Sequence, residues 1–377
     1  MNIDSQHTID AAEVLLSAID GTLTDTHLKI ATRSHGQVGG GEASMVQALV
    51  SWAQRQKCPT LRTYAARADD PQIQTLVNHL TGLSAVLLSD ETQAGNGMDI
   101  TDEAFRLAES RYLALVDDPA ESRGPQCEIL CADHLSFPFS PYLYDKSGLE
   151  PILRSEVAFK ELARLIVAAG VMRSSPEASR LIAAIGSALF ELFKNTEDHA
   201  KLDVSGNVPS RALRGIHARR HDRTREDLDE LARGTPTMAP FFASLQAPAG
   251  RKGIRFAEFS VFDSGPGLAA RWRKEQPEML TDEQELGAIA ECFEHRKTTK
   301  DSSGRGVGLP LVIDALKKRR GFLRLRTGRQ SLFVDFSDQR DLEFGSAPRF
   351  SHFSTRRKMA LATGTLITFI MPLDRHE

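Results

Sequence analysis

The sequence predicts an α/β (α+β) fold in two parts, on three observations. From about residue 25 to 120, short apolar runs alternate with amphipathic stretches, which is typical of strands that alternate with helices. After residue 150, two amphipathic helices are followed by longer strand-like segments that end at glycine-rich turns. The chain has 377 residues, which is long for one compact domain and suits two.

The N-terminal part is predicted to begin with a short helix or arm over 1–24, followed by a small α/β domain over 25–150 that senses or docks. Its expected elements alternate in type, with strands at 28–32, 60–66 and 84–90 and helices at 42–56 and 71–83. Three glycines at 39–41 lie ahead of one helix, where backbone N–H groups can hold a phosphate. They lack the Lys-Ser/Thr of a P-loop, so we interpret them as a flexible turn.

The C-terminal part opens with predicted helices at about 154–169 and 176–199. The second begins with Ser-Pro-Glu, which supplies an N-cap and a proline at the first helical position. Its apolar residues form one stripe that we expect to face the core. The opposite face carries Glu191, Asn195 and Asp198 beside small residues, a pattern that by itself is typical of a solvated helix face.

A strand-like segment at 256–263 ends in Asp263 and is followed by the sharp turn Ser-Gly-Pro-Gly. Gly265 and Gly267 in this turn permit backbone conformations and close approaches that a Cβ would block. An aspartate at the end of a strand beside such a turn can accept a hydrogen bond from an exocyclic amine. A plain tight turn is the alternative interpretation.

A second glycine-rich segment, 301–308, comes directly before an apolar, helix-like stretch. Backbone N–H groups there, with the positive end of the helix dipole, suit phosphate oxygens. The polar segment 291–303, which leads into it, could fold over a nucleotide as a mobile lid. The last predicted strand, 364–372, begins with Gly-Thr.

Together these segments resemble the GHKL superfamily of histidine-kinase-like ATPases, which includes DNA gyrase B subunits, MutL-type repair proteins, heat-shock chaperones, histidine kinases and anti-sigma serine kinases. Four motifs occur in the family's order: Glu191-Leu-Phe-Lys-Asn195, Asp263-Ser-Gly265-Pro-Gly267, Gly304-Arg-Gly306-Val-Gly308-Leu309 and Gly364-Thr365. One such motif is weak, whereas four in order are specific. The resemblance covers 151–377, and it implies a Bergerat-type α/β sandwich with a mixed sheet and helices on one face. The segments 205–250 and 337–363 would be insertions.

The resemblance implies ATP and Mg²⁺ as ligands. Glu191 would orient or deprotonate the attacking nucleophile, and Lys300 would reach the γ-phosphate. Asn195 would bind Mg²⁺, and Asp263 would recognise the adenine amine. The other residues expected at the nucleotide would contact it through the backbone, a hydroxyl or a close approach: Gly265, Gly267, Gly304, Gly306, Val307, Gly308, Leu309 and Thr365.

The resemblance leaves three functions open. The first is a soluble ATPase or nucleotide-gated switch in regulation, stress or defence. The second is a protein kinase, of serine rather than histidine, that acts on a separate partner, because 154–169 holds no histidine for a dimerisation box. The third is a non-enzymatic, ATP-gated module that binds protein or nucleic acid. We expect a protein partner and no transducer domain after Pro372, and a homodimer stays open.

Charge and composition narrow the partners. The net charge of −3 favours neither nucleic acid nor a membrane. We interpret the arginine-rich segment 210–234 as a solvated helix rather than a basic surface for nucleic acid or an acidic partner, because no aromatic residues lie among its arginines. No apolar run approaches the roughly 18 residues of a membrane span. With four scattered cysteines, we expect a cytoplasmic protein that has reduced thiols and no membrane partner.

Overall fold

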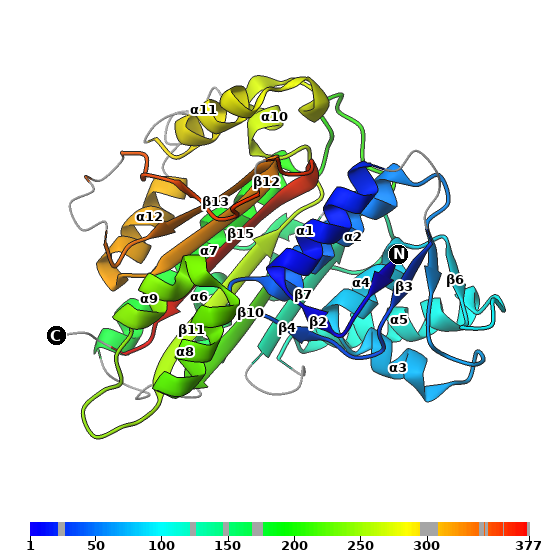
Figure 1. The fold of residues 1–377 in the computed structure, drawn as a ribbon, viewed down its shortest axis with the longest axis horizontal. Coiled ribbons are helices and arrows are strands. Elements are labelled where there is room, and N and C mark those ends of the chain that lie inside the picture. Colours follow the sequence, from blue (N-terminus) through cyan, green and yellow to red (C-terminus); the bar gives the residue numbers. More distant parts are fainter. Residues whose placement is uncertain are drawn as a thin grey trace.

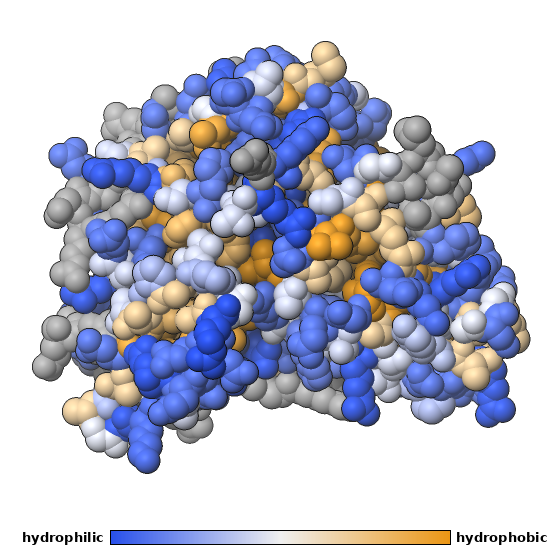
Figure 2. Space-filling model, viewed as in Figure 1, coloured by the Kyte–Doolittle hydropathy of each residue, from blue (hydrophilic) through white to orange (hydrophobic). Residues whose placement is uncertain are grey.

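The computed structural model describes residues 1–21, 27–120, 126–145, 151–167, 176–294, 308–338, 343, 346–356 and 358–374. It contains a four-stranded sheet from the N-terminal part and a seven-stranded sheet from the rest of the chain, with helices on the faces of both (Figure 1). Hydrophilic residues cover most of the face seen in Figure 2, with a few hydrophobic groups near its middle. Within the described residues, no helix is long and apolar enough to span a membrane.

The smaller sheet is parallel, and its strands alternate with helices along the chain as the sequence predicts. Its order is β1 (Asn2–Ile3), β3 (Leu28–Ile30), β5 (Thr60–Arg62) and β6 (Glu91–Gln93). The helices of this part are α1 (Ile9–Asp20), α2 (Gly41–Arg55), α3 (Pro71–Val77), α4 (Leu80–Leu88) and α5 (Thr101–Asp117). The first residues are not a free arm, because β1 pairs with β3 and α1 packs against α2.

One predicted strand is wrong. Most of the segment 84–90 belongs to helix α4, and the strand β6 comes directly after it. All nine residues of α4 are buried, so the helix is apolar on every side. It therefore lacks the amphipathic period that separates a surface helix from a buried strand. The predicted helix at 71–83 is divided between α3 and α4.

The larger sheet is antiparallel at every described pairing, so the mixed sheet implied by the GHKL resemblance is wrong for this sheet. Its order is β14 (Ser351–His352), β13 (Gln330–Asp335), β12 (Phe322–Gly328), β15 (Ala362–Pro372), β11 (Ile254–Phe262), β10 (Leu213–Arg223) and β7 (Gln126–Ala132). Two short pairings stand apart from both sheets: β2 (Gln6–His7) with β4 (His35–Gly36), and β8 (Tyr144–Asp145) with β9 (Ile152–Leu153).

Two strands of the larger sheet come from segments that the sequence assigns elsewhere. β7 lies in the predicted N-terminal domain, 25–150, and β10 lies in the predicted insertion, 205–250. β10 is hydrogen-bonded to β7 on one side and to β11 on the other. The arginine-rich segment 210–234 is therefore not one solvated helix: its first half is an inner strand, and only its second half forms helix α8 (Arg225–Gly234).

Helices cover both faces of the larger sheet, so the arrangement with helices on one face, which the GHKL resemblance implies, is wrong for this sheet. α6 (Glu156–Val167), α7 (Pro176–His199) and α12 (Gly308–Arg319) pack on one face, where residues such as Ile367 and Phe369 of β15 join their core. The apolar stripe predicted on α7 faces this core. The other face, which includes Leu366 and Ile370, is covered by α2, α8 and α9 (Ala239–Ser244). Beyond β11 lie α10 (Leu268–Arg273) and α11 (Asp282–Cys292), which pack against each other.

Candidate nucleotide site

Asp263 lies directly after β11, at the point where the Asp-Ser-Gly-Pro-Gly motif meets β15. Its Oδ1 accepts the backbone N–H of Gly265 at 2.9 Å and that of Thr365 at 3.1 Å. The N–H of Asp263 donates in turn to the carbonyl of Thr365 at 3.0 Å. Antiparallel pairing of β11 with β15 thus brings together two motifs that are about a hundred positions apart in the sequence.

Burial changes the acidity of this carboxyl. Burial raises the pKa of Asp263 to about 6, although the two N–H groups that it accepts act to lower it. Both of these hydrogen bonds end on Oδ1, and within the described residues Oδ2 accepts none. Oδ2 is therefore the oxygen that can carry a proton or accept a further donor.

The two glycines of the motif lie where a side chain would collide. A Cβ at Gly265 would lie 2.7 Å from the Cα and Cβ atoms of Ala200, directly after α7. Gly267 has φ 90°, and a Cβ there would lie 2.8 Å from Thr327 Oγ1. Close backbone approach, and at Gly267 also a left-handed conformation, explain why glycine stands at both positions.

Thr327, at the end of β12, is a member of this cluster that sequence reasoning missed. Its hydroxyl accepts the N–H of Leu268 at 3.0 Å and lies 3.3 Å from the hydroxyl of Thr365. No motif marks this threonine, because only the pairing of β12 with β15 brings it to Thr365. Thr327 therefore connects the Asp-Ser-Gly-Pro-Gly turn to β15.

The polar face of α7 lies against the start of α12. A Cβ at Gly308 would overlap the Glu191 carboxylate, so these two motifs are in direct contact. Burial raises the pKa of the Glu191 carboxyl, although Lys194 acts to lower it. Asn195 follows one turn later on α7 and is half-buried. Leu309, which the sequence places at the nucleotide, has its side chain buried in the core beneath α7 and α12.

Four of the predicted contacts lie outside the described residues. Lys300, Gly304, Gly306 and Val307 fall within 295–307. Most of the predicted lid, 291–303, and most of the predicted phosphate contacts belong to this range, so they stay predictions. The first two residues of the predicted lid are the end of α11.

Arg214 lies on β10, within the segment 210–234 for which the sequence predicts a solvated helix. Its guanidinium is fully buried and forms a bidentate pair with Asp133, at 2.6 and 2.7 Å. It also donates to Glu197, near the end of α7, at 2.9 Å and to the Tyr144 hydroxyl at 3.2 Å. The sequence of β10 alternates arginine or histidine with small or apolar residues, and this period of two is the pattern that could have predicted a strand with Arg214 on a buried face.

Comparisons with known proteins add no assignment: no protein-family model, no curated protein and no solved structure matches this chain.

Proposed function

We propose that this protein binds Mg²⁺·ATP in the manner of GHKL proteins and hydrolyses it slowly as a nucleotide-dependent switch. The observation that carries the proposal is the carboxylate of Asp263, which lies at the meeting point of two motifs with one oxygen held by backbone N–H groups and the other left to accept. A carboxylate placed in this way is suited to an exocyclic amine such as that of adenine.

The surroundings of Asp263 are polar. The hydroxyls of Thr327 and Thr365 lie 3.3 Å apart beside the turn that follows this residue. Buried polar groups that can pair with only one type of ligand give strong selectivity, because a ligand without the matching donor leaves them unpaired. We expect adenine nucleotides to bind and guanine nucleotides to be rejected.

The residues at α7 suit a magnesium–phosphate complex. Mg²⁺ prefers oxygen ligands and is commonly held by one or two protein groups together with phosphates and water. The amide oxygen of Asn195 would be the protein ligand in this proposal, since the described residues hold no group of three histidines, cysteines or carboxylates for an all-protein site. Glu191, one turn away, would orient or deprotonate the attacking water, and a raised pKa suits a general base.

Two substitutions test the site. Asp263→Asn should weaken ATP binding by about tenfold or more in calorimetry, because a charged acceptor is lost. Glu191→Ala should keep ATP binding and lose phosphate release. The matched control is Asp335→Asn, a strand-end aspartate at the other end of the paired β12–β13 strands, whose carboxylate accepts the N–H of Ser337.

Incubation of the protein with γ-labelled ATP separates the three functions that the sequence leaves open. Free phosphate from γ-labelled ATP supports the hydrolase, whereas label on a partner protein indicates a kinase and tight binding without either product indicates a binding module. Normal ATP affinity in Asp263→Asn would contradict the proposed nucleotide site itself.

A further inference from the structure

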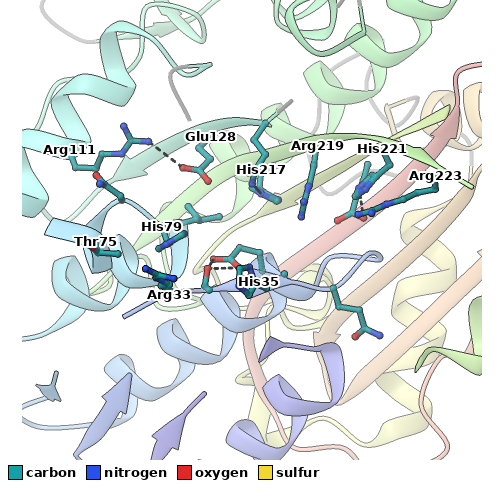
Figure 3. Close-up of a pocket in the computed structure, with 18 residues that line it drawn as sticks. Arg33, His35, Thr75, His79, Arg111, Glu128, His217, Arg219, His221 and Arg223 are labelled. Atoms are coloured by element: carbon teal, nitrogen blue, oxygen red, sulfur yellow. Dashed lines mark hydrogen bonds and ion pairs between the residues drawn. The ribbon is translucent and has the colours of Figure 1, made fainter. Parts of the chain in front are cut away.

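A polar pocket of about 860 Å³ lies between the larger sheet and the N-terminal part. Four arginines and four histidines line it, against three glutamates. Figure 3 shows the side chains of β10 along one side of the pocket and those of Arg33, His35, Thr75 and His79 on the other. Its volume falls in the range of small-molecule sites, roughly 300–1,000 Å³.

The basic side of the pocket follows from the period of β10. Successive side chains of a strand point to opposite faces of the sheet. Ile216 and Ala218 lie in the core beneath α6 and α7, and the alternate residues His217, Arg219, His221 and Arg223 line the pocket. The arginine-rich segment of the sequence thus supplies a row of pocket residues.

Two of these residues are buried polar groups without a complete set of partners. His217 and His221 are each 4% exposed. His217 Nδ1 has no hydrogen-bond partner among the described residues. His221 Nε2 has none within hydrogen-bond distance either, although it lies 3.8 Å from Glu258 Oε2. Burial lowers the pKa of His217 to about 4 and that of His221 well below its usual value, so both rings are neutral near pH 7. A buried polar atom left unpaired is costly, and a bound ligand is one way to satisfy it.

The glutamates of the pocket are already engaged by the protein. Gly39 and Gly40, with φ 98° and 92°, donate their N–H groups to the two oxygens of Glu258 at 2.8 and 3.1 Å. This glycine turn therefore holds an anion as phosphate-binding turns do, but the anion is the protein's own carboxylate. Glu128 lies 4.0 Å from Arg111 as an ion pair.

Glu42, the third glutamate, is held by three neighbours. It lies 3.0 Å from His7 Nδ1, and it accepts hydrogen bonds from the Thr81 hydroxyl at 2.6 Å and from the Ser34 hydroxyl at 3.1 Å. Apart from Arg111, the arginines of the pocket form no ion pair with a carboxylate of the described residues. They are Arg33, Arg219 and Arg223. Four arginines against three glutamates leave the pocket with a small excess of positive charge, which attracts anions.

We propose that this pocket binds a small phosphorylated molecule, with its phosphate on Arg219 and Arg223 and its neutral polar groups on His217 and His221. Arginine holds phosphate oxygens in a bidentate fork, and a phosphate offers up to two charges where a carboxylate offers one. The described residues of the pocket hold no group that could bind a metal ion instead. The site is separate from the cluster at Asp263 and does not depend on ATP binding there.

The test is calorimetry with inorganic pyrophosphate as the probe, on the full-length protein. We expect one site with a Kd below about 1 mM, in the wild type and equally in Asp263→Asn. The double substitution Arg219→Gln and Arg223→Gln should weaken binding by about tenfold or more, because it removes at least one hydrogen bond between charged groups. The matched control is Arg220→Gln. Arg220 lies on the same strand, but its partner in the β10–β11 register is Ala257, which belongs to the core on the other face of the sheet.

Each outcome decides the proposal, with melting curves to show that every variant is folded. Binding that survives the double substitution, or that Arg220→Gln weakens as strongly, would overturn the pocket as the site. Loss of binding in Asp263→Asn alone would place the probe in the nucleotide site and overturn the proposal. Citrate that binds as tightly at equal ionic strength would overturn the preference for phosphate, and absence of any pyrophosphate binding would overturn the site altogether.

Discussion

At the scale of single residues, Asp263 shows how a carboxylate is prepared by its surroundings. Two backbone N–H groups stabilise its ionised form, yet burial outweighs them and raises its pKa to about 6. Since both N–H groups bind Oδ1, a proton would sit on Oδ2, which is the oxygen that the proposed ligand needs. Ionisation of this group therefore costs stability in the absence of ligand.

This balance predicts a pH-dependent effect of Asp263→Asn. A carboxyl whose pKa rises on folding, from 3.8 to about 6, contributes stability below the lower value and loses it as pH rises through the upper one. Relative to the wild type, the variant should gain up to roughly 3 kcal/mol of unfolding free energy between about pH 4 and pH 7. Urea unfolding at the two pH values measures the gain. A constant difference between the two proteins would show that Asp263 is not perturbed.

At the scale of elements, α7 and β10 contrast in how well the sequence predicts them. α7 combines an apolar stripe with a polar face, and both its length and its buried side follow from that period. β10 alternates basic residues with small and apolar ones, and its strand character depends on pairing with β7 and β11. Strand propensity depends strongly on such context, which explains why the sequence of this segment favours a helix instead.

The link between these two elements predicts a large loss of stability in Arg214→Ala. The substitution leaves the carboxylates of Asp133 and Glu197 without their buried guanidinium. Removing one partner of a buried ion pair typically costs about 3–5 kcal/mol, so we expect a loss of about 3 kcal/mol or more in chemical denaturation.

The control for Arg214 is Arg164→Ala, because Arg164 forms an exposed pair with Glu161 on α6. Exposed pairs contribute about 0–1 kcal/mol, and this variant should stay close to the wild type. Equal losses in the two variants would mean that the buried network does not stabilise the fold.

At the scale of the whole molecule, the N-terminal part and the larger sheet share one core. Leu130 and Leu366 of the larger sheet belong to the same apolar cluster as α1 and α2. Glu13 of α1 forms a buried ion pair with Arg326 of β12, with Nε–Oε1 at 2.7 Å. A domain boundary at residue 150 would therefore cut through a common core.

A fragment of residues 151–377 should consequently fail to fold cooperatively. It lacks the edge strand β7 and the helix α2 that covers one face of the sheet. We expect a broad thermal transition and binding of a hydrophobic dye, where the full chain shows one sharp transition. Extension to residue 126 restores β7 but not α2, and should not rescue the fragment. A sharp transition in either fragment would show that the C-terminal part folds without the N-terminal helices.

Several elements and motifs could be predicted because their signals are local. The helix over 176–199, the strand before Asp263 and the closing strand at Thr365 could be placed because side-chain period and glycine turns act over a few residues. Their assignment to ATP rests on the order of the motifs, and it stays a proposal for calorimetry to test.

Which of these segments come together depends on the folded chain. Strand pairing joins Asp263 to Thr365, turns His217 and Arg219 toward a pocket, and bonds Gly39 to Glu258 of the larger sheet. The physical reason is that burial and hydrogen-bond partners are set by contacts far apart in the sequence, which no local period encodes. The same arginines that are typical of a solvated helix in the sequence become a buried anchor or a pocket wall in the fold.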